Sequence, residues 1–471
     1  MTMTQSQSRL SGASDQEVLS AKRQRIYPRE VHGRFAMWRV IGAVALLGLY
    51  YVTPWIPWQD RQAILFDLPH RKFYIFEWVF WPQDFFYLSL LLLIAAFALF
   101  FFTTLAGRLW CGYACPQTVW TEIFLWIERL VEGDRPQQMR LDRKAWNDPD
   151  KLLRKTSKHL IWLFFSGFTG FVFVGYFVPV KELAHDLWTF SSGSWEIFWV
   201  FFYGFATYLN AGMLREQVCI YMCPYARFQS AMFDKDTLII SYDASRGEPR
   251  GSRPRGVDPR TQGLGDCINC TLCVQVCPTG IDIRNGLQEQ CIACAACVDV
   301  CDEVMNKVGY PQGLIRYTTE HAMSGNPSRI VRPRVVAYAA ILLSVMAGFV
   351  YALEHRMPLA LDIIRDRSLQ FRELEEGLVE NVYTLMIMNK DDKPHHYAVQ
   401  VSGLDGLLLQ GVDWPLLVPG DEVFAQPVSV RVDSVQLQAR STRIRFTVRE
   451  TDRPHLQVTE DARFLGPGAQ R

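Results

Sequence analysis

The feature that most constrains the fold of this chain is a pair of cysteine runs with identical spacing. Cys-x-x-Cys-x-x-Cys-x-x-x-Cys occupies residues 267–277 and recurs at residues 291–301. Three closely spaced thiolates can surround one face of an iron–sulfur cubane, and in two-cluster bacterial ferredoxins the fourth cysteine of each run ligates the other cluster. The spacing therefore predicts a ferredoxin-like module with two 4Fe–4S clusters. One is expected on Cys267, Cys270, Cys273 and Cys301, and the other on Cys291, Cys294, Cys297 and Cys277.

The residues around the two runs support this interpretation. Pro278 follows the first run, and Gly280 and Gly286 allow the chain to reverse toward the second. Asp302 stands where the second run would have its proline, which predicts a reshaped loop without the loss of a ligand. Zinc ribbons are the alternative, but they hold each metal with two Cys-x-x-Cys pairs. The spacing therefore favours iron–sulfur clusters.

The remaining cysteines form two copies of a second motif. Cys-x-Tyr-x-Cys-Pro occurs at residues 111–116 and 219–224, each time after an apolar stretch, which indicates an internal duplication of two parallel helical hairpins. Residues i and i+4 share one face of a helix, so each pair is expected to present two thiols together. The proline then ends the membrane helix or opens an interfacial one. If the halves pack symmetrically, four thiols converge: Cys111, Cys115, Cys219 and Cys223.

The spacing of these four thiols leaves their role open. Soft thiolates suit Cu(I), zinc or a third iron–sulfur centre. Each pair could instead cycle between dithiol and disulfide, or all four could be inert buried thiols. All 12 cysteines fall within the four motifs, which indicates metal ligation in a reducing compartment and argues against a disulfide framework.

Five apolar stretches approach the length needed to cross a bilayer. The mean hydropathy of +0.02 is too low for a chain that is apolar throughout, so the apolar residues must be concentrated in such segments. The first stretch is short and contains Pro54, so an interfacial segment is its alternative. The predicted spans are Val40–Ile56, Phe85–Ala106, Leu160–Val180, Trp195–Leu214 and Val335–Leu353.

Lys and Arg residues predict the direction of these spans. They are abundant before the first span, between spans two and three, and between spans four and five, whereas the loop between spans three and four has only Lys181. This pattern places the N-terminus and the cysteine motifs in the cytoplasm and the C-terminal region outside. The first ~35 residues are polar, which argues against a cleaved signal peptide.

The predicted organisation is a multi-domain membrane protein. It comprises a cytoplasmic segment (1–37), four spans as two hairpins that each close with a cysteine motif (38–214), a cytoplasmic region with the ferredoxin-like domain at about 260–305 (215–333), a fifth span (334–356) and an external β-domain (365–471). In the last part, alternating apolar residues such as Val428 and Val430, separated by turns, predict an immunoglobulin-like β-sandwich.

The chain shows no sign of some common redox cofactors or of nucleic-acid binding. None of the nine histidines lies within a predicted span, which argues against a bis-histidine haem, and there is no Rossmann fingerprint. A net charge of +1 gives no field that would favour nucleic acid. Electrons are therefore expected from another protein, from quinol or from a soluble reductant.

Long stretches of the chain resemble the cytochrome c oxidase accessory protein family known as CcoG, FixG or RdxA. The resemblance covers nearly the whole chain, and its most specific stretches are Leu65–Phe73, Trp81–Phe85, Gly107–Thr118, Glu128–Arg135 and Tyr221–Ser230. It implies a bacterial inner-membrane protein that helps to mature the cbb-type haem–copper oxidase by reducing Cu(II) to Cu(I).

The resemblance also implies partners and a role for the membrane cysteines. Membrane lipid, copper ions and a copper-exporting ATPase or other oxidase assembly proteins are the expected partners, together with an unidentified electron donor. Cys111, Cys115, Cys219 and Cys223 would form the copper-handling site or a further redox relay. The alternatives are a generic membrane polyferredoxin that passes electrons from quinol or a soluble donor to a redox partner, and a non-redox copper chaperone.

Overall fold

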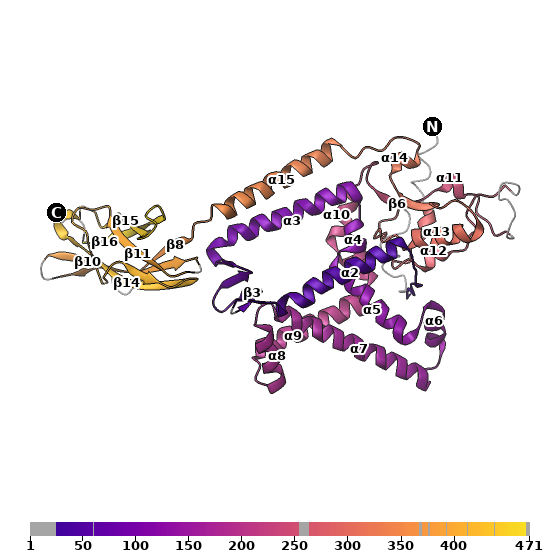
Figure 1. Ribbon diagram of the computed structural model, residues 1–471, viewed down its shortest axis with the longest axis horizontal. Coiled ribbons are helices and arrows are strands. Elements are labelled where there is room, and N and C mark those ends of the chain that lie inside the picture. Colours follow the sequence, from indigo (N-terminus) through magenta and orange to yellow (C-terminus); the bar gives the residue numbers. More distant parts are fainter. Residues whose placement is uncertain are drawn as a thin grey trace. The chain divides into compact units, whose positions relative to one another are not determined.

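The computed structural model describes residues 25–59, 61–253, 263–366, 370–374, 377–391, 393–411, 413–437 and 439–467. The first 24 residues, and with them most of the segment that argues against a signal peptide, lie outside this description. The chain forms two compact units (Figure 1). The first extends to Met346 and carries all the cysteines, and the second comprises Trp78–Trp81 and the chain from Ala347 onward.

Within the described residues, five helical segments are long and apolar enough to cross a membrane, as the sequence predicts. The first begins at Arg34 and has 22 residues, which is long enough to span and longer than predicted. The segments are Arg34–Trp55 (α2 and the 3-10 turn η2), Pro82–Ala106 (η3 and α3), Pro149–Val174 (α7), Ser194–Leu214 (α9 and the π-helix η4) and Pro333–Glu354 (α15).

Helix α7 corrects the predicted third span. The helix begins at Pro149, before the predicted Leu160, because the Asp148 carboxylate accepts hydrogen bonds from two N–H groups of the first turn. It ends at Val174, and α8 (Val180–Thr189) follows. His159, which the predicted bounds leave just before the span, therefore lies within α7 beside Lys158 at its charged end, and its ring is 2.9 Å from the Tyr208 hydroxyl.

The spanning helices of the first unit pack closely where small residues meet. A Cβ atom on Gly170 of α7 would collide with the Val200 carbonyl of α9, so these two helices can approach only because this residue is glycine. This pair matches one predicted hairpin. Helix α2 packs instead on α5 and α7, through Ala43 against Val119 and a 2.7 Å hydrogen bond between the Tyr51 and Thr169 hydroxyls.

Short helices surround the two membrane cysteine motifs. Helix α5 is amphipathic: Phe124 and Glu128 are buried, whereas Leu130 is 84% exposed. Asp134 and Gln137 form a capping box at the start of α6. The helices in this region are α4 (Leu109–Tyr113), α5 (Pro116–Glu132), α6 (Arg135–Arg143), the π-helix η5 (Val218–Met222) and α10 (Pro224–Met232).

The ferredoxin-like module lies in the chain between two paired antiparallel strands, β6 (Ile239–Tyr242) and β7 (Ile315–Thr318). It is therefore longer than the predicted 260–305. Residues 260–262 of that predicted range lie outside the described residues. Helix α12 (Leu272–Gln275) ends before Pro278, whereas α13 (Ala296–Val308) continues past Asp302. The expected loop after the second run is therefore a helix, because no proline stops it. Short helices α11 (Ala244–Gly247), η7 (Ile283–Asn285) and α14 (Glu320–Met323) complete this region.

The C-terminal unit is the predicted immunoglobulin-like sandwich of two antiparallel sheets. One sheet has the order β12-β14-β10-β8, with β9 beside β10, and the other has the order β13-β11-β15-β16. Tyr383 and Val430 of one sheet and Phe446 of the other are fully buried in the shared core. The domain begins earlier than the predicted residue 365, because β8 starts at Leu359 and pairs with β10.

The strands of the sandwich are β8 (Leu359–Arg365), β9 (Arg372–Glu373), β10 (Leu378–Asn389), β11 (His395–Ser402), β12 (Leu408–Gln410), β13 (Leu416–Val418), β14 (Glu422–Asp433), β15 (Ser441–Glu450) and β16 (Gln457–Leu465). The described residues between α2 and α3 include the short strands β1 (Pro57–Trp58), β2 (Arg61–Gln62), β3 (Ile64–Asp67), β4 (Lys72–Ile75) and β5 (Trp78–Phe80).

Candidate functional site

Two cavities in the ferredoxin-like module are each lined by four of the predicted ligand cysteines. One is lined by Cys267, Cys270, Cys273 and Cys301. The other is lined by Cys277, Cys291, Cys294 and Cys297, with Cys273 also at its wall. Each quartet joins three cysteines of one run to the fourth cysteine of the other, which is the grouping that the spacing predicts. Across the described residues, no three His, Cys, Asp or Glu side chains lie close enough together for a single metal ion.

The backbone between the cysteines has the shape that an iron–sulfur cluster needs. Asn269 and Thr271 in the first run, and Ala293 and Ala295 in the second, all have φ between +54° and +59°. Left-handed residues in such loops turn successive N–H groups toward one point and create a concavity that binds anions, including iron–sulfur clusters. Holding four non-glycine residues in this conformation costs free energy. The strain and its repetition in both runs fit the predicted clusters.

Burial favours the protonated form of two of the module's thiols by raising the pKa of each. Burial, together with the neighbouring Cys273, raises the pKa of Cys301 to about 12. Burial likewise raises the pKa of Cys291 to about 12. Metal binding must displace these protons, so ligand formation and proton release are coupled here.

The four membrane-motif thiols also converge. Burial raises the pKa of Cys219 to about 12, and the nearby thiols Cys115, Cys111 and Cys223 raise it further. Burial raises the pKa of Cys111 to about 11 although Gln229 accepts a hydrogen bond from its thiol at 3.4 Å. The four thiols therefore lie within electrostatic range of one another, although no three of them are close enough together in the described structure to hold a single metal ion.

The helical geometry predicted for each pair is wrong in one respect. Only the first cysteine of each motif lies within a helical turn, Cys111 in α4 and Cys219 in η5. Cys115 and Cys223 are extended and cap the next helix, because a residue before proline avoids the helical conformation. The prolines open α5 and α10, which is one of the two predicted outcomes.

The backbone confirms that the two motifs are structural repeats. Gly107 and Arg215 each stand four residues before the first cysteine, with φ of 56° and 49° and ψ of −121° and −114°. Glycine adopts this conformation freely, but arginine must be held in it. Arg215 Nε donates to the Gly212 carbonyl at 2.9 Å, and its Nη2 donates to Glu128 at 2.8 Å.

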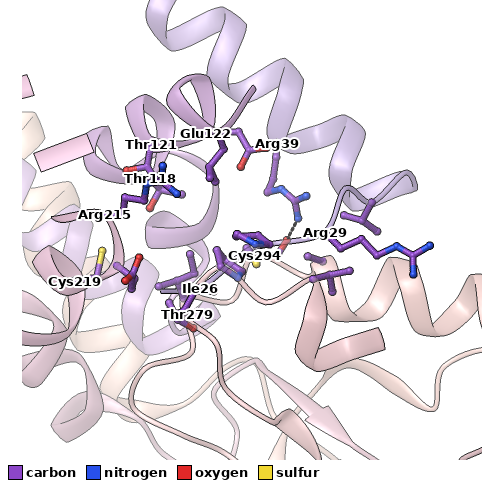
Figure 2. Close-up of a pocket in the computed structure, with 18 of the residues that line it drawn as sticks. Ile26, Arg29, Arg39, Thr118, Thr121, Glu122, Arg215, Cys219, Thr279 and Cys294 are labelled. Carbon is purple, nitrogen blue, oxygen red and sulfur yellow. Dashed lines mark hydrogen bonds between the residues drawn. The ribbon is translucent and has the colours of Figure 1, made fainter. Parts of the chain in front are cut away.

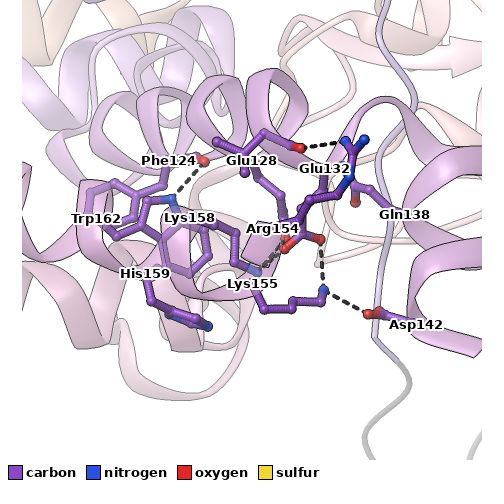
Figure 3. Close-up of polar contacts among 12 residues, drawn as sticks. Phe124, Glu128, Glu132, Gln138, Asp142, Arg154, Lys155, Lys158, His159 and Trp162 are labelled. Atoms are coloured by element: carbon purple, nitrogen blue, oxygen red, sulfur yellow. Dashed lines mark hydrogen bonds and ion pairs between the residues drawn. The ribbon is translucent and has the colours of Figure 1, made fainter. Parts of the chain in front are cut away.

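The Glu128 partner of Arg215 belongs to a buried network of charges (Figure 3). Lys158 contacts Glu128 at 3.3 Å and Glu132 at 2.7 Å, and Lys155 contacts Glu132 at 2.7 Å. Burial would raise the pKa of Glu128, but the nearby cations lower it to about 2. The ionised Glu128 carboxylate therefore ties Arg215, which precedes the second motif, to α5 and α7.

The first motif packs directly on the second cluster-binding run. A Cβ atom on Gly112 would lie 2.8 Å from the Ile292 carbonyl oxygen and 2.9 Å from the Cα atom of Cys294. Tyr113 lies 3.3 Å from the hydroxyl of Tyr317, which in turn donates to the Ala293 carbonyl at 2.6 Å. The membrane thiols and the second quartet are therefore neighbours within one compact unit.

Charged side chains that the motifs did not single out hold this contact. Arg39 donates to the Cys294 carbonyl at 2.6 Å, and Arg108 donates to the carbonyls of Glu289 and Ala226. Asp299 accepts from the first N–H groups of α2, including that of Ala36 at 2.7 Å. The glycine within the first motif is the signal in the sequence that could have indicated such a close approach.

A small cavity of about 60 Å³ lies between the two thiol groups (Figure 2). Cys219, at the left of the view, and Cys294, near its centre, both line it, and Arg39 donates a hydrogen bond to the Cys294 backbone. Thr118 and Glu122 of α5 contribute oxygen atoms to its wall. The space is lined by both polar and apolar side chains and lies next to one thiol of each group, Cys219 and Cys294.

Known families match the same parts of the chain. The family described as 4Fe-4S dicluster domain matches residues 214–320, and the 4Fe-4S binding domain family matches residues 88–132. The family described as IG-like fold at C-terminal of FixG matches residues 349–467. The 88–132 match contains Cys111 and Cys115, but Cys219 and Cys223 lie outside it.

Three relatives match most of the chain. Nitrogen fixation protein FixG from Rhizobium meliloti (strain 1021) is 38% identical over 82% of this chain and 80% of its own length. Protein RdxB from Cereibacter sphaeroides is 39% identical over 88% of this chain and 90% of its own. Protein RdxA from the same organism is 40% identical over 83% of this chain and 85% of its own.

Proposed function

The chain belongs to the FixG/RdxA family of iron–sulfur electron-transfer proteins, and on this basis we propose that it reduces Cu(II) to Cu(I) for the assembly of a cbb-type cytochrome c oxidase. The observation that carries the proposal is the contact between Gly112, inside the first membrane thiol motif, and the run that contains Cys294. A site for soft metals thereby lies against a site for an electron carrier.

The chemistry of the residues supports reduction at this contact. The two quartets in the module would hold the clusters, which when bound supply single electrons. Each Cu(II) ion takes up one electron, and thiolates stabilise the Cu(I) product more than the Cu(II) substrate. Cys111, Cys115, Cys219 and Cys223 would bind the product and release their protons as it binds. Gly112, Arg39 and Arg108 would keep the two sites in contact.

The proposal includes an orientation and partners. The excess of Lys and Arg on the motif-bearing side supports a bacterial inner-membrane protein with its cysteines in the cytoplasm and its immunoglobulin-like domain in the periplasm. Cu(I) would pass to a copper-exporting ATPase or another oxidase assembly protein. A reporter fused after Arg471 should be active only outside the cytoplasm, and activity inside the cytoplasm would overturn this orientation.

An anaerobic copper assay tests the proposal. Protein reduced with dithionite and freed of excess reductant receives Cu(II), and a Cu(I)-specific chelator is followed together with the visible absorption of the clusters. Cu(I) should appear as the clusters are oxidised. If the clusters stay reduced while Cu(II) is present, the protein is no cupric reductase. Copper bound without any redox change would instead support a chaperone with structural clusters.

The double variant Cys111→Ser, Cys219→Ser tests whether the membrane-motif thiols bind copper. It should lose Cu(I) retention while keeping the absorption of both module clusters, because the serine hydroxyl is a poor Cu(I) ligand. If Cu(II) turnover and Cu(I) retention were both unchanged, these thiols would be inert groups that only pack in the protein interior. Reduced clusters that pass electrons to a protein partner, but not to Cu(II), would favour the generic polyferredoxin.

A third iron–sulfur centre at the four thiols is a second candidate. The match of the 4Fe-4S binding domain family to residues 88–132 favours it. Iron analysis separates the two candidates, because two cubanes contain about eight iron atoms per chain and three contain about twelve. The cupric reductase proposal with copper at the four thiols expects about eight.

A further inference from the structure

A second and larger cavity lies beside the small one. It is a groove of about 610 Å³ between the start of α2 and the side of α5. Its apolar wall is formed by Met37, Val40, Trp126 and Leu130. Its polar end contains Arg39, Glu122 and Arg129, which also line the small cavity that reaches Cys294. The groove therefore leads from apolar surface to a predicted cluster ligand.

One side of the groove is exposed apolar surface at the start of a candidate spanning helix. Met37 and Val40 belong to the first turns of a spanning helix and are 54% and 42% exposed. Leu130 is 84% exposed on a helix whose other face is buried, as expected for a helix at the membrane interface. In the proposed membrane orientation, a ligand dissolved in the bilayer would reach the groove from this apolar side.

The polar end presents one acceptor and one donor side by side. The Glu122 carboxylate accepts from Trp126 Nε1 at 3.0 Å and lies 3.8 Å from Arg129 Nη1. Arg129 Nε is buried, and no group in the described part of the chain accepts its hydrogen bond. Arg39, in the same wall, donates to the Cys294 carbonyl at 2.6 Å. A ligand that both donates and accepts, and that carries an apolar body, satisfies these groups.

We propose that this groove binds a membrane hydroquinone, which is the electron donor of the protein. This inference rests on the proposed electron-transfer function and identifies the compound that would supply the electrons. A hydroquinone hydroxyl would donate to Glu122, and the carbonyl of the quinone product would accept from Arg129 Nε. A lipid phosphate fits less well, because the Glu122 carboxylate would repel it.

The reaction balances with the acceptors already proposed. Oxidation of one hydroquinone to the quinone releases two electrons and two protons. The two cysteine quartets would hold two 4Fe–4S clusters, each of which would accept one electron when bound. The two electrons are the number that two Cu(II) ions need to become Cu(I). Glu122 accepts a proton from the hydroxyl that it faces, and both protons leave to water. The other residues of the polar end bind and orient.

The test uses the full chain in phosphatidylcholine nanodiscs, with menadiol as donor and menadione as the binding probe. Val40→Trp fills the groove and should weaken menadione binding and slow cluster reduction by menadiol about tenfold or more. Val44→Trp, one turn further along α2 and 61% exposed, is the matched control and should behave as the unsubstituted protein. Glu122→Gln should retain menadione binding but slow cluster reduction by about 100-fold, because the proton acceptor is lost.

The outcomes separate this inference from the proposed function. Equal menadione binding by Val40→Trp and Val44→Trp would overturn the groove as a hydroquinone site. So would complete displacement of menadione by phosphatidylglycerol, which would make the groove a lipid site. Dithionite-reduced Val40→Trp should still reduce Cu(II) at the unsubstituted rate. If dithionite-reduced unsubstituted protein does not reduce Cu(II), the proposed function fails while menadione binding remains measurable.

Discussion

The two copies of the cysteine–tyrosine–cysteine–proline motif have the same backbone but different surroundings. Each has a left-handed residue four positions before its first cysteine, a break at its second cysteine and a proline that opens the next helix. The first copy contains Gly112 and touches the cluster-binding run. The second copy has Ile220 at the equivalent position, and its Arg215 is tied to the buried charge network.

This difference indicates a division of labour after duplication. Both copies supply thiols to one group, so the thiols and the turn around them are shared. In the first copy, Gly112 has no side chain, so the ferredoxin-like module can pack against it. In the second copy, Arg215 binds Glu128 and so connects the site to α5 and α7. Outside the shared thiols, substitutions in the first copy should therefore change electron transfer, and substitutions in the second copy should change stability.

Exchange of the two central residues should give the largest effect. Gly112→Ile would place side-chain atoms where the Ile292 and Ala293 carbonyls lie, 2.8 and 2.9 Å from a Cβ atom. The module must then move, and a displacement of about 1 Å can cost about 100-fold in rate. We expect this loss in Cu(I) formation by dithionite-reduced protein with unchanged cluster absorption. The reciprocal Ile220→Gly is the control, and an equal loss there would refute the division of labour.

The charge network should give the next largest effect, on stability. The pKa of Glu128 is lowered to about 2 from its ordinary value of 4.5, a difference that corresponds to about 3 kcal/mol of stability above the unfolded pKa. Because the folded pKa is depressed, this stability is lost as the pH falls from about 4.5 toward 2. The melting temperature of the unsubstituted protein should fall more steeply over this range than that of Glu128→Gln. Parallel curves would show that Glu128 does not stabilise the fold.

The contact between Asp299 and α2 should give the smallest effect. Its carboxylate accepts from the N–H groups of Phe35 and Ala36 at the start of the helix. Asp299→Ala should lower the free energy of unfolding by about 1 kcal/mol, as for the loss of a helix cap. Asp299→Asn should lose less, because its amide oxygen can still accept. A larger cost for Asn than for Ala would show that the contact is not a cap.

The sequence predicts the parts of this fold that depend on periodicity. The five spans, the alternating strands around Val428 and Val430, and the grouping of cysteines into quartets follow from hydropathy and spacing. The start of α7 does not, because its first turns are charged. Lys155 and Lys158 are buried there by partners on α5 and α6 that are distant in the sequence.

The candidate site is predictable in its residues but not in its contacts. Spacing names all twelve cysteines, and the repeat predicts that the four membrane thiols converge. The docking of the module on Gly112 and the reach of Arg39 to Cys294 depend on tertiary packing, which one sequence does not encode in a local pattern. The extended conformation of Cys115 could have been predicted from Pro116 alone.

The central claim is that both motif copies together form one metal site beside the cluster-binding run. An anaerobic Cu(I) titration of the protein with intact clusters, in competition with a Cu(I) chelator, tests it most directly. We expect one tightly bound Cu(I) per chain, and we expect this binding to be lost in Cys111→Ser and also in Cys219→Ser. Two tightly bound ions per chain, with one retained by each single variant, would show two independent thiol pairs and contradict it.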